Sequence, residues 1–149
     1  MRYFDHAASA PPYPEVIASV AQAMERYYAN PSSLHRLGQA AEQLLGKARA
    51  VIAGALKTEP GEIFFTSGGT ESNNTAIRAA ARTFSNRGRH IITSMIEHPS
   101  VFETCRQLEE DGYEVTYLSP DRSGRIRPAQ VAEAVRDDTI LVSIMHVNN

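Results

Sequence analysis

The chain has 149 residues, 42% of them hydrophobic and 21% charged, which matches one ordinary globular domain and excludes wholesale disorder. Its formal net charge of −2 argues against nucleic acid or an anionic membrane as a partner. The longest apolar run, residues 139–147, is too short to span a bilayer. The sequence shows no secretory signal and a single cysteine, so we expect a cytoplasmic protein without an internal disulfide.

The spacing of apolar residues predicts two helices first, at residues 14–29 and 37–56. The second is expected to bury an apolar stripe, formed by Leu37, Ala41, Leu44, Leu45, Ala48, Ile52 and Leu56. Strands are then predicted at residues 63–66, 90–93, 114–118 and 140–147, with helices at 71–84, 99–108 and 128–135 between them. The last strand is apolar throughout, as expected of a strand buried on both faces. This alternation predicts an α/β fold with a mostly parallel sheet and flanking helices.

The sequence ends at Asn149, directly after the last predicted strand. In open α/β sheets, ligands bind beyond the carboxyl ends of the strands, so a site residue is expected at this point. No helix follows to cover the strand. We therefore expect the chain to be part of a longer protein.

The first candidate site is the turn Ser67-Gly68-Gly69-Thr70, between a predicted strand and a predicted helix. The glycines allow a tight turn and close approach of a ligand, and free N–H groups at a helix start favour a phosphate. The hydroxyls of Ser67 and Thr70 can add donors. The alternative is an ordinary turn with Thr70 or Ser72 as the N-cap. Neither GxGxxG nor GxxxxGK[ST] is present, which argues against dinucleotide and P-loop folds.

Two further candidates follow predicted strands. Glu97-His98 comes after the strand at 90–93, and a histidine there can stack on a planar ligand or move protons near neutral pH. The alternative is a capping or loop histidine, with Glu97 as a solvated carboxylate or a first-turn charge. Asn148-Asn149 follows the last strand, and its amides can hydrogen-bond a polar ligand, although a plain turn is the alternative. The other histidines lack metal-ligand spacing, and Cys105 is expected to be buried without a catalytic role.

Five segments of the chain, in this order and at these separations, resemble the amino-terminal part of cysteine desulfurases of the NifS/IscS type. These are pyridoxal-phosphate enzymes of the class V aminotransferase group. The segments are residues 3–8, 30–35, 65–74, 97–98 and 142–149. The resemblance covers essentially the whole chain and implies an aspartate aminotransferase-like fold. It implies that residues 1–14 are an amino-terminal arm on the small-domain side and that residues 15–149 are part of the cofactor-binding large domain.

The resemblance also implies roles for individual residues. The cofactor is pyridoxal 5'-phosphate, whose phosphate group is held at Gly69 and Thr70. His98 matches a histidine that stacks over the pyridine ring and assists proton transfer, and Asn149 matches an asparagine close to cofactor and substrate. Residues 30–35 match a segment near the mouth of the active site and the dimer contact. No metal is implied.

The implied reaction converts L-cysteine to L-alanine and an enzyme-bound persulfide, for iron–sulfur cluster assembly or other sulfur delivery. The implied partners are L-cysteine, a second copy in a homodimer, and a sulfur acceptor or iron–sulfur scaffold protein. Two alternatives stay open. One is a fragment that binds pyridoxal phosphate or pairs with a relative without catalysis. The other is a different class V enzyme, such as a selenocysteine lyase.

The sequence also departs from the family. Ala8-Ser9-Ala10-Pro11 stands where the family usually has Ala-Thr-Thr-Pro, so one threonine becomes serine and the other is lost. The Schiff-base lysine, the aspartate that pairs with the pyridine nitrogen and the persulfide-carrying cysteine of the family lie downstream of Asn149. Lys47 and Lys57 precede the glycine turn and are not expected to replace that lysine. We therefore expect the 149-residue chain alone to lack desulfurase activity.

Overall fold

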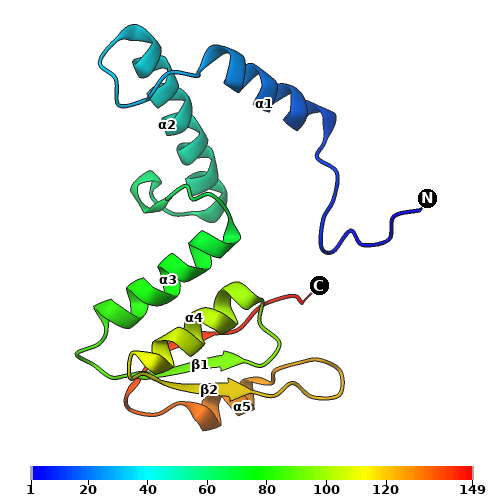
Figure 1. Ribbon diagram of the computed structural model, residues 1–149, viewed down its shortest axis with the longest axis vertical. Coiled ribbons are helices and arrows are strands. Elements are labelled where there is room, and N and C mark those ends of the chain that lie inside the picture. The colour runs from blue at the N-terminus through cyan, green and yellow to red at the C-terminus, as the bar shows by residue number, and fades with distance from the viewer. Residues whose placement is uncertain (1, 149) are drawn as a thin grey trace. The chain divides into compact units, whose positions relative to one another are not determined.

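The computed structural model describes residues 2–148 and divides into two compact units, the first ending at Phe65 and the second beginning at Thr66 (Figure 1). The predicted boundary between residues 14 and 15 concerns the domains of a whole enzyme and stays a prediction. No helix among the described residues is both long enough and apolar enough to cross a membrane.

The first unit is helical. It contains α1 (Pro14–Arg26), α2 (Arg36–Leu56) and a short 3-10 helix, η1 (Pro60–Glu62). Pro14 opens α1, where its missing N–H removes no helical hydrogen bond. The helix ends at Arg26, earlier than the predicted residue 29, because Tyr27 leaves the helical region with φ −121°.

Helix α2 has the predicted extent, but most of its predicted apolar stripe is not buried. The chain entering α2 packs so closely on Gly38 that a Cβ there would clash with the carbonyl oxygen of Ser33. The buried residues of α2 are Gly38, Ala41 and Ala53. Leu44 is half-buried, whereas the other apolar positions of the predicted stripe are exposed, namely Leu37, Leu45, Ala48, Ile52 and Leu56. Periodicity identifies an apolar face, but burial also requires an element that covers it.

The strand predicted at residues 63–66 is wrong. These residues follow η1 without regular secondary structure, and they belong to none of the strands in the described part of the chain. The side chain of Phe64 is 82% exposed. The aromatic and β-branched composition favours extended backbone, but a strand also needs a neighbour to accept its ladder hydrogen bonds.

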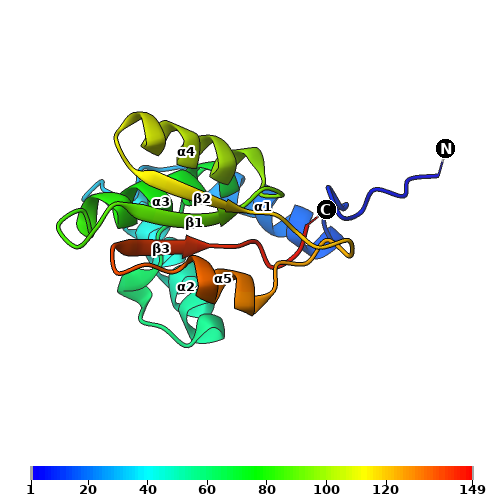
Figure 2. The same ribbon diagram turned by 90° about the horizontal axis from the view of Figure 1, so that it is seen from below.

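The second unit confirms the predicted α/β fold with a parallel sheet. Its strands are β1 (His90–Ser94), β2 (Glu114–Leu118) and β3 (Thr139–Ser143), in the spatial order β2-β1-β3. Both pairings are parallel, and Figure 2 shows the three strands side by side. The register between β1 and β3 shifts after His90.

Three helices flank this sheet, α3 (Gly69–Thr83), α4 (Pro99–Glu110) and α5 (Pro128–Ala134). Helix α4 connects β1 to β2 and contacts both strands, while α3 contacts α4 and β3. Helix α5 connects β2 to β3 and lies on the opposite side of the sheet from α4 (Figures 1 and 2). The connection from β1 to β2 and the connection from β2 to β3 run in opposite directions along the sheet, so connections of one hand place their helices on opposite faces.

The core of the second unit lies between the sheet and helices α3 and α4. Its buried members are Ile77, Ala81, Ile91, Val101, Cys105 and Leu108. All five residues of β1 are buried, whereas β3 is only half-buried and ends at Ser143. The prediction that the 140–147 segment is the strand buried on both faces is therefore wrong. The central position belongs to β1, because both β2 and β3 pair with it.

Candidate functional site

The predicted phosphate turn lies at the start of α3, which begins at Gly69, two residues before the predicted start. Gly68 is the N-cap and supplies no side-chain hydrogen bond, so the alternative of a Thr70 or Ser72 cap is wrong. Gly68 has an ordinary extended backbone (φ 163°), so a strained turn does not explain the glycine. A Cβ on Gly68 or Gly69 would meet no atom within 4 Å. The glycines therefore leave the first N–H groups of α3 open to an approaching group.

Ser67 and Glu71 form a closed pair beside this helix start. The hydroxyl of Ser67 donates to Glu71 Oε2 at 2.7 Å, and the backbone N–H of Ser67 donates to the same oxygen at 2.6 Å. These two bonds, the hydroxyl bond first, lower the pKa of the Glu71 carboxyl. The Ser67 hydroxyl, predicted as an extra donor for a phosphate, is thus bonded to Glu71. The backbone of Gly69 and Thr70 is left as the main anion-binding element.

His98 lies beside the same helix start. It follows β1 and is the N-cap of α4, where Nδ1 accepts a hydrogen bond from the backbone N–H of Ser100 at 3.1 Å. The predicted capping alternative is therefore confirmed, and it is compatible with the functional one because a cap uses only one ring nitrogen. A hollow of about 340 Å³, here called the His98 hollow, is lined by Gly69, Thr70, Asn73, His98 and Ser100. Three of the predicted site residues thus meet in one place.

Two asparagines of α3 bind this helix to α4 at the His98 hollow. Asn73 Nδ2 donates to Ser100 Oγ at 2.9 Å, and Asn74 Nδ2 donates to the Ser100 carbonyl oxygen at 3.3 Å. Thr104 Oγ1 donates to Asn74 Oδ1 at 2.7 Å. The amides hold the helix starts that carry Gly69 and His98 at a defined separation. Sequence reasoning assigned them no role, because their partners lie on another helix, distant in the chain.

The alternative interpretation of Glu97 as a solvated carboxylate is wrong. Its Oε1 atom accepts from the Ser94 hydroxyl at 2.7 Å and from the backbone N–H of Met145 at 2.8 Å. It therefore connects the end of β1 to the segment that follows β3. A backbone donor from Met145 is a contact that only the folded sheet can reveal.

Asn148 reaches the same edge of the sheet, where its Nδ2 donates to the Ile96 carbonyl oxygen at 2.7 Å. It lines a larger hollow of about 480 Å³ together with residues at or after the ends of the three strands, namely Ser94, Ile96, Gly124, Arg125, Ile126, Ile144, Met145 and His146. This hollow lies where open α/β sheets bind their ligands. Asn149, the residue predicted to lie near cofactor and substrate, falls outside the described residues.

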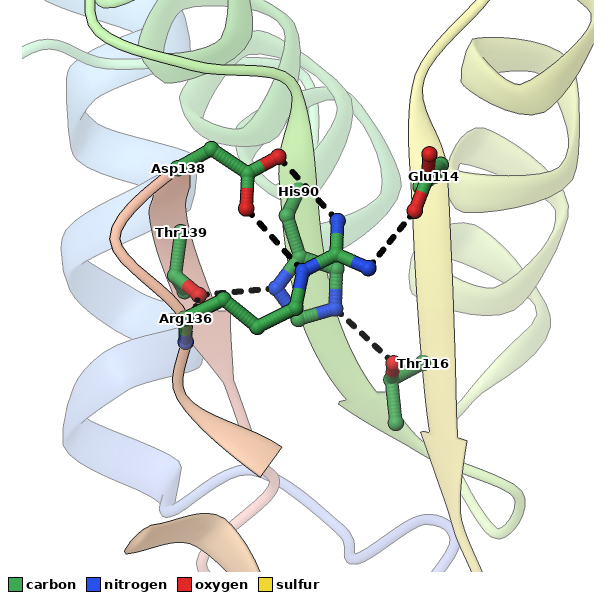
Figure 3. A network of polar contacts seen from close by, with 6 residues as sticks. All are labelled: His90, Glu114, Thr116, Arg136, Asp138 and Thr139. Carbon is green, nitrogen blue, oxygen red and sulfur yellow. Dashed lines mark hydrogen bonds and ion pairs between the residues drawn. The ribbon is translucent and has the colours of Figure 1, made fainter. Parts of the chain in front are cut away.

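His90 lies at the opposite end of β1 and was not singled out by its sequence pattern. It is 1% exposed, with Nδ1 2.7 Å from Thr139 Oγ1 and Nε2 2.8 Å from Thr116 Oγ1 (Figure 3). Each ring nitrogen therefore has one hydroxyl partner, one from each neighbouring strand. A polar residue at the start of an apolar strand, with threonines in both partner strands, is the signal that could have found it.

A set of surface charges stands over the His90 ring. Arg136 binds Glu114 at 2.7 Å through Nη1 and Asp138 at 3.0 Å through Nε (Figure 3). Burial is the largest cause that lowers the pKa of His90, and the Arg136 charge is the second, while Asp138 and Glu114 act in the opposite direction. The neutral ring is therefore the stable form in the folded unit.

Cys105 is a poor candidate for chemistry in this chain, whereas the expectation that neither Lys47 nor Lys57 replaces the family's lysine stays a prediction. The Cys105 side chain is fully buried in the core, as expected. Burial, and then the charges of Glu97 and Glu109, raise the pKa of its thiol to about 11, so the reactive thiolate is scarce at neutral pH. Lys47 and Lys57 belong to the first unit, in α2 and directly after it.

Comparisons with known proteins agree over the whole chain. The profile of the family "Aminotransferase class-V" matches residues 2–149. A curated relative, "Cysteine desulfurase IscS" of Photobacterium profundum, is 48% identical over 99% of this chain. Among solved structures, "SspA in complex with cysteine" has a TM-score of 0.91 at 44% identity, and a "NIFS-like protein" has 0.92 at 39%.

These matches cover much less of the other proteins. The chain spans 37% of the length of the Photobacterium relative. It spans 43% and 40% of the two solved chains, while 99% and 98% of its own length is covered.

Proposed function

Because this chain belongs to the class-V aminotransferase family, we propose that it is the amino-terminal part of a cysteine desulfurase that depends on pyridoxal phosphate. The whole enzyme converts L-cysteine to L-alanine and an enzyme-bound persulfide. The observation that carries the proposal is a match to a cysteine desulfurase across 99% of the chain, with Gly69, Thr70 and His98 around one hollow.

The residues of the His98 hollow fit the cofactor. The uncapped start of α3 presents backbone N–H groups, and the space beside Gly68 and Gly69 is open, as a phosphate group requires. His98 lines the same hollow and offers an aromatic ring to a planar group. Pyridoxal phosphate, when bound, supplies an electron sink for the substrate carbon. Gly69 and Thr70 bind its phosphate, while His98 packs against its ring and holds a proton for transfer.

Other steps need groups that this chain does not offer. The lysine that binds the cofactor covalently, the aspartate for the pyridine nitrogen and the cysteine that accepts sulfur belong to the remainder of the enzyme. Cys105 is unsuited to accept sulfur, because it is buried and its pKa is raised to about 11. Asn149 lies near the substrate in this proposal. The 149-residue chain alone is therefore inactive as a desulfurase.

The wider setting is also part of the proposal. Residues 1–14 form an arm on the small-domain side of the enzyme, and residues 15–149 belong to its large domain. The enzyme is a cytoplasmic homodimer that delivers sulfur to an acceptor or an iron–sulfur scaffold protein. The exposed apolar side chains of α1, including Val16, Ile17, Val20 and Met24, are consistent with a surface that further protein covers.

The test is a titration of the purified chain with pyridoxal phosphate, followed by borohydride reduction and intact mass measurement. We expect perturbation of the Gly69, Thr70 and His98 resonances in NMR spectra and no stoichiometric attachment to a lysine. Stoichiometric attachment at Lys47 or Lys57 would overturn the assignment of the lysine to the remainder of the enzyme. Perturbations confined to residues outside the His98 hollow would overturn the cofactor site.

A second measurement addresses the reaction. The coding region beyond Asn149 is sequenced, and the longest protein it encodes is assayed for alanine and sulfide released from L-cysteine. We expect activity that depends on added pyridoxal phosphate and falls by at least about 100-fold in H98A, the scale of general acid–base catalysis. Sulfide release by the 149-residue chain alone would contradict the proposal.

A further inference from the structure

The His98 ring is fixed through a single nitrogen atom. Nδ1 accepts from the Ser100 backbone N–H at 3.1 Å and lies 2.8 Å from Ser100 Oγ. A backbone N–H can only donate, so Nδ1 must keep its lone pair. The proton of the neutral ring is therefore on Nε2. This atom points away from the partners of Nδ1 and has no hydrogen-bond partner among residues 2–148.

The direction of the second bond to Nδ1 is set from α3. Asn73 Nδ2 donates to Ser100 Oγ at 2.9 Å, which occupies a lone pair of that hydroxyl. The Ser100 hydrogen is then available for Nδ1, and Ser100 is only 7% exposed, so water has little access to compete. The donors run in one direction, from Asn73 to Ser100 and from Ser100 to His98. We call this set the Asn73–Ser100–His98 relay.

His35 shows what a histidine cap requires without such a relay. It also caps its helix, α2, but its Nδ1 accepts from the backbone N–H of Gly38, three positions on rather than two, at 3.2 Å. The donor in the His35 cap, Gly38, has no hydroxyl, whereas the donor in the His98 cap, Ser100, has one that lies 2.8 Å from Nδ1. Capping alone therefore does not explain Ser100 or Asn73. Their added effect is to bind the His98 ring to α3, the helix that begins at the predicted phosphate site.

We propose that Asn73 and Ser100 are positioning residues that hold neutral His98 as an Nε2–H donor facing the ligand of the His98 hollow. The consequence for catalysis rests on the proposed function, but the relay itself does not. In its neutral form His98 then donates a hydrogen bond at Nε2 and cannot take up a proton there. A group other than neutral His98 must remove the first proton from the substrate.

The test reads the two ring nitrogens of His98 by NMR in the ¹⁵N-labelled chain, without pyridoxal phosphate. Spectra are recorded near pH 8.5, about two units above the ordinary histidine pKa of about 6.5. H98Q identifies the His98 signals, and His35 is the internal reference. We expect Nδ1 as the unprotonated nitrogen in the unmodified chain. A ring with its proton on Nδ1 would overturn the proposal without any variant.

N73D reverses the relay with almost no change in shape. The introduced carboxylate can only accept, so the Ser100 hydroxyl turns towards it and presents a lone pair to Nδ1. We expect the ratio of Nδ1–H to Nε2–H forms to rise by about 2- to 10-fold, the equivalent of one hydrogen bond. S100A, which removes the hydroxyl but keeps the backbone N–H, shifts the ratio less, and S100T restores it.

Q107E is the matched control. It adds the same charge on α4, beside Arg78 and outside the relay, and leaves the tautomer ratio unchanged. If N73D and Q107E shift the tautomer ratio equally, the effect is due to the added charge alone, and the proposal is overturned. An unchanged ratio in folded N73D and S100A would also overturn it. Because cofactor is absent, a failure of the relay is distinguishable from a failure of the chain to bind pyridoxal phosphate.

Discussion

His90 and His98 stand at the two ends of β1, and the fold uses them in opposite ways. His90 opens the strand and is buried, with a threonine hydroxyl on each ring nitrogen. His98 follows the strand at its carboxyl end, is exposed, and uses only Nδ1 in a cap. Both nitrogens of the His90 ring have partners within the protein, while Nε2 of His98 has none among residues 2–148.

The two histidines differ in how many ring nitrogens make hydrogen bonds within the protein, and this number separates their roles. Burial of His90 removes it from solvent, and its two hydroxyl partners make it a structural connection between β1 and both neighbouring strands. At the other end, the cap orients His98 without using Nε2. The carboxyl end of a parallel sheet is the usual place for a ligand, and its amino end is not.

The largest expected effect is at His90. H90A leaves a cavity and removes the imidazole partner of two half-buried threonine hydroxyls, so we expect a loss of about 2–4 kcal/mol in the unfolding free energy of the second unit. Hydrogen exchange of the Ile91 and Ile92 amides measures it, because these lie in the fully buried β1. H146A, at an exposed histidine after β3, is the control and should change stability by less than about 0.5 kcal/mol. Equal effects of the two variants would contradict the structural role of His90.

The stability of the second unit should also depend on pH through His90. Burial first, and the Arg136 charge second, lower its pKa in the folded state from the ordinary 6.5. The unfolded chain therefore binds the proton more readily, and folding is favoured most above about pH 6.5 and loses stability as pH falls below it. Exchange of the β1 amides between about pH 6.5 and 5 should show this loss. The glutamine in H90Q cannot titrate, so this variant should be less stable, but its unfolding free energy should not change with pH in this range. If the pH dependence in H90Q equals that of the unmodified chain, His90 is not its cause.

Local pattern predicted much of this unit, and the failures share one physical reason. Strand β2 and helix α4 follow from period and turn residues close in sequence, and the structure has them within two residues of their predicted ends. Residues 63–66 have strand composition but no partner, which depends on the rest of the sheet. The alternative of a solvated Glu97 fails because one of its two donors, the Met145 N–H, is 48 residues away in the sequence.

The same reason applies to the candidate site. Gly69, Thr70 and His98 could be named because a helix start and a strand end are local features. Asn73 could not, because its partner Ser100 lies on another helix, 27 residues away. Candidate binding residues at a helix start or a strand end can be named from local sequence, whereas contacts such as that of Asn73 with Ser100 become visible only when the elements pack.

A smaller effect is expected at His98, and it separates the cap from the ligand role. H98A removes the side chain that caps α4, so we expect a loss of about 1 kcal/mol. H98N keeps a good N-cap and should retain most of that stability, measured by exchange of the first amides after the α4 cap. Both variants lack the imidazole and should weaken the perturbation of Gly69 and Thr70 by pyridoxal phosphate. If H98N binds the cofactor as the unmodified chain does, the ring is not part of the site.

The smallest effect is expected from substitutions that change the charges over His90 and leave its ring in place. R136Q removes the second cause of the lowered pKa, so the His90 pKa should move up and the acid-side loss of stability should shrink. D138N removes a charge that acts in the opposite direction, so its shift should be downward. Carbon-13 titration of the His90 ring measures both shifts. Salt near 1 M, where the screening length is about 3 Å, should reduce the difference between the variants. Shifts of the same sign in R136Q and D138N would mean that altered packing, and not the exposed charges, controls the His90 ring.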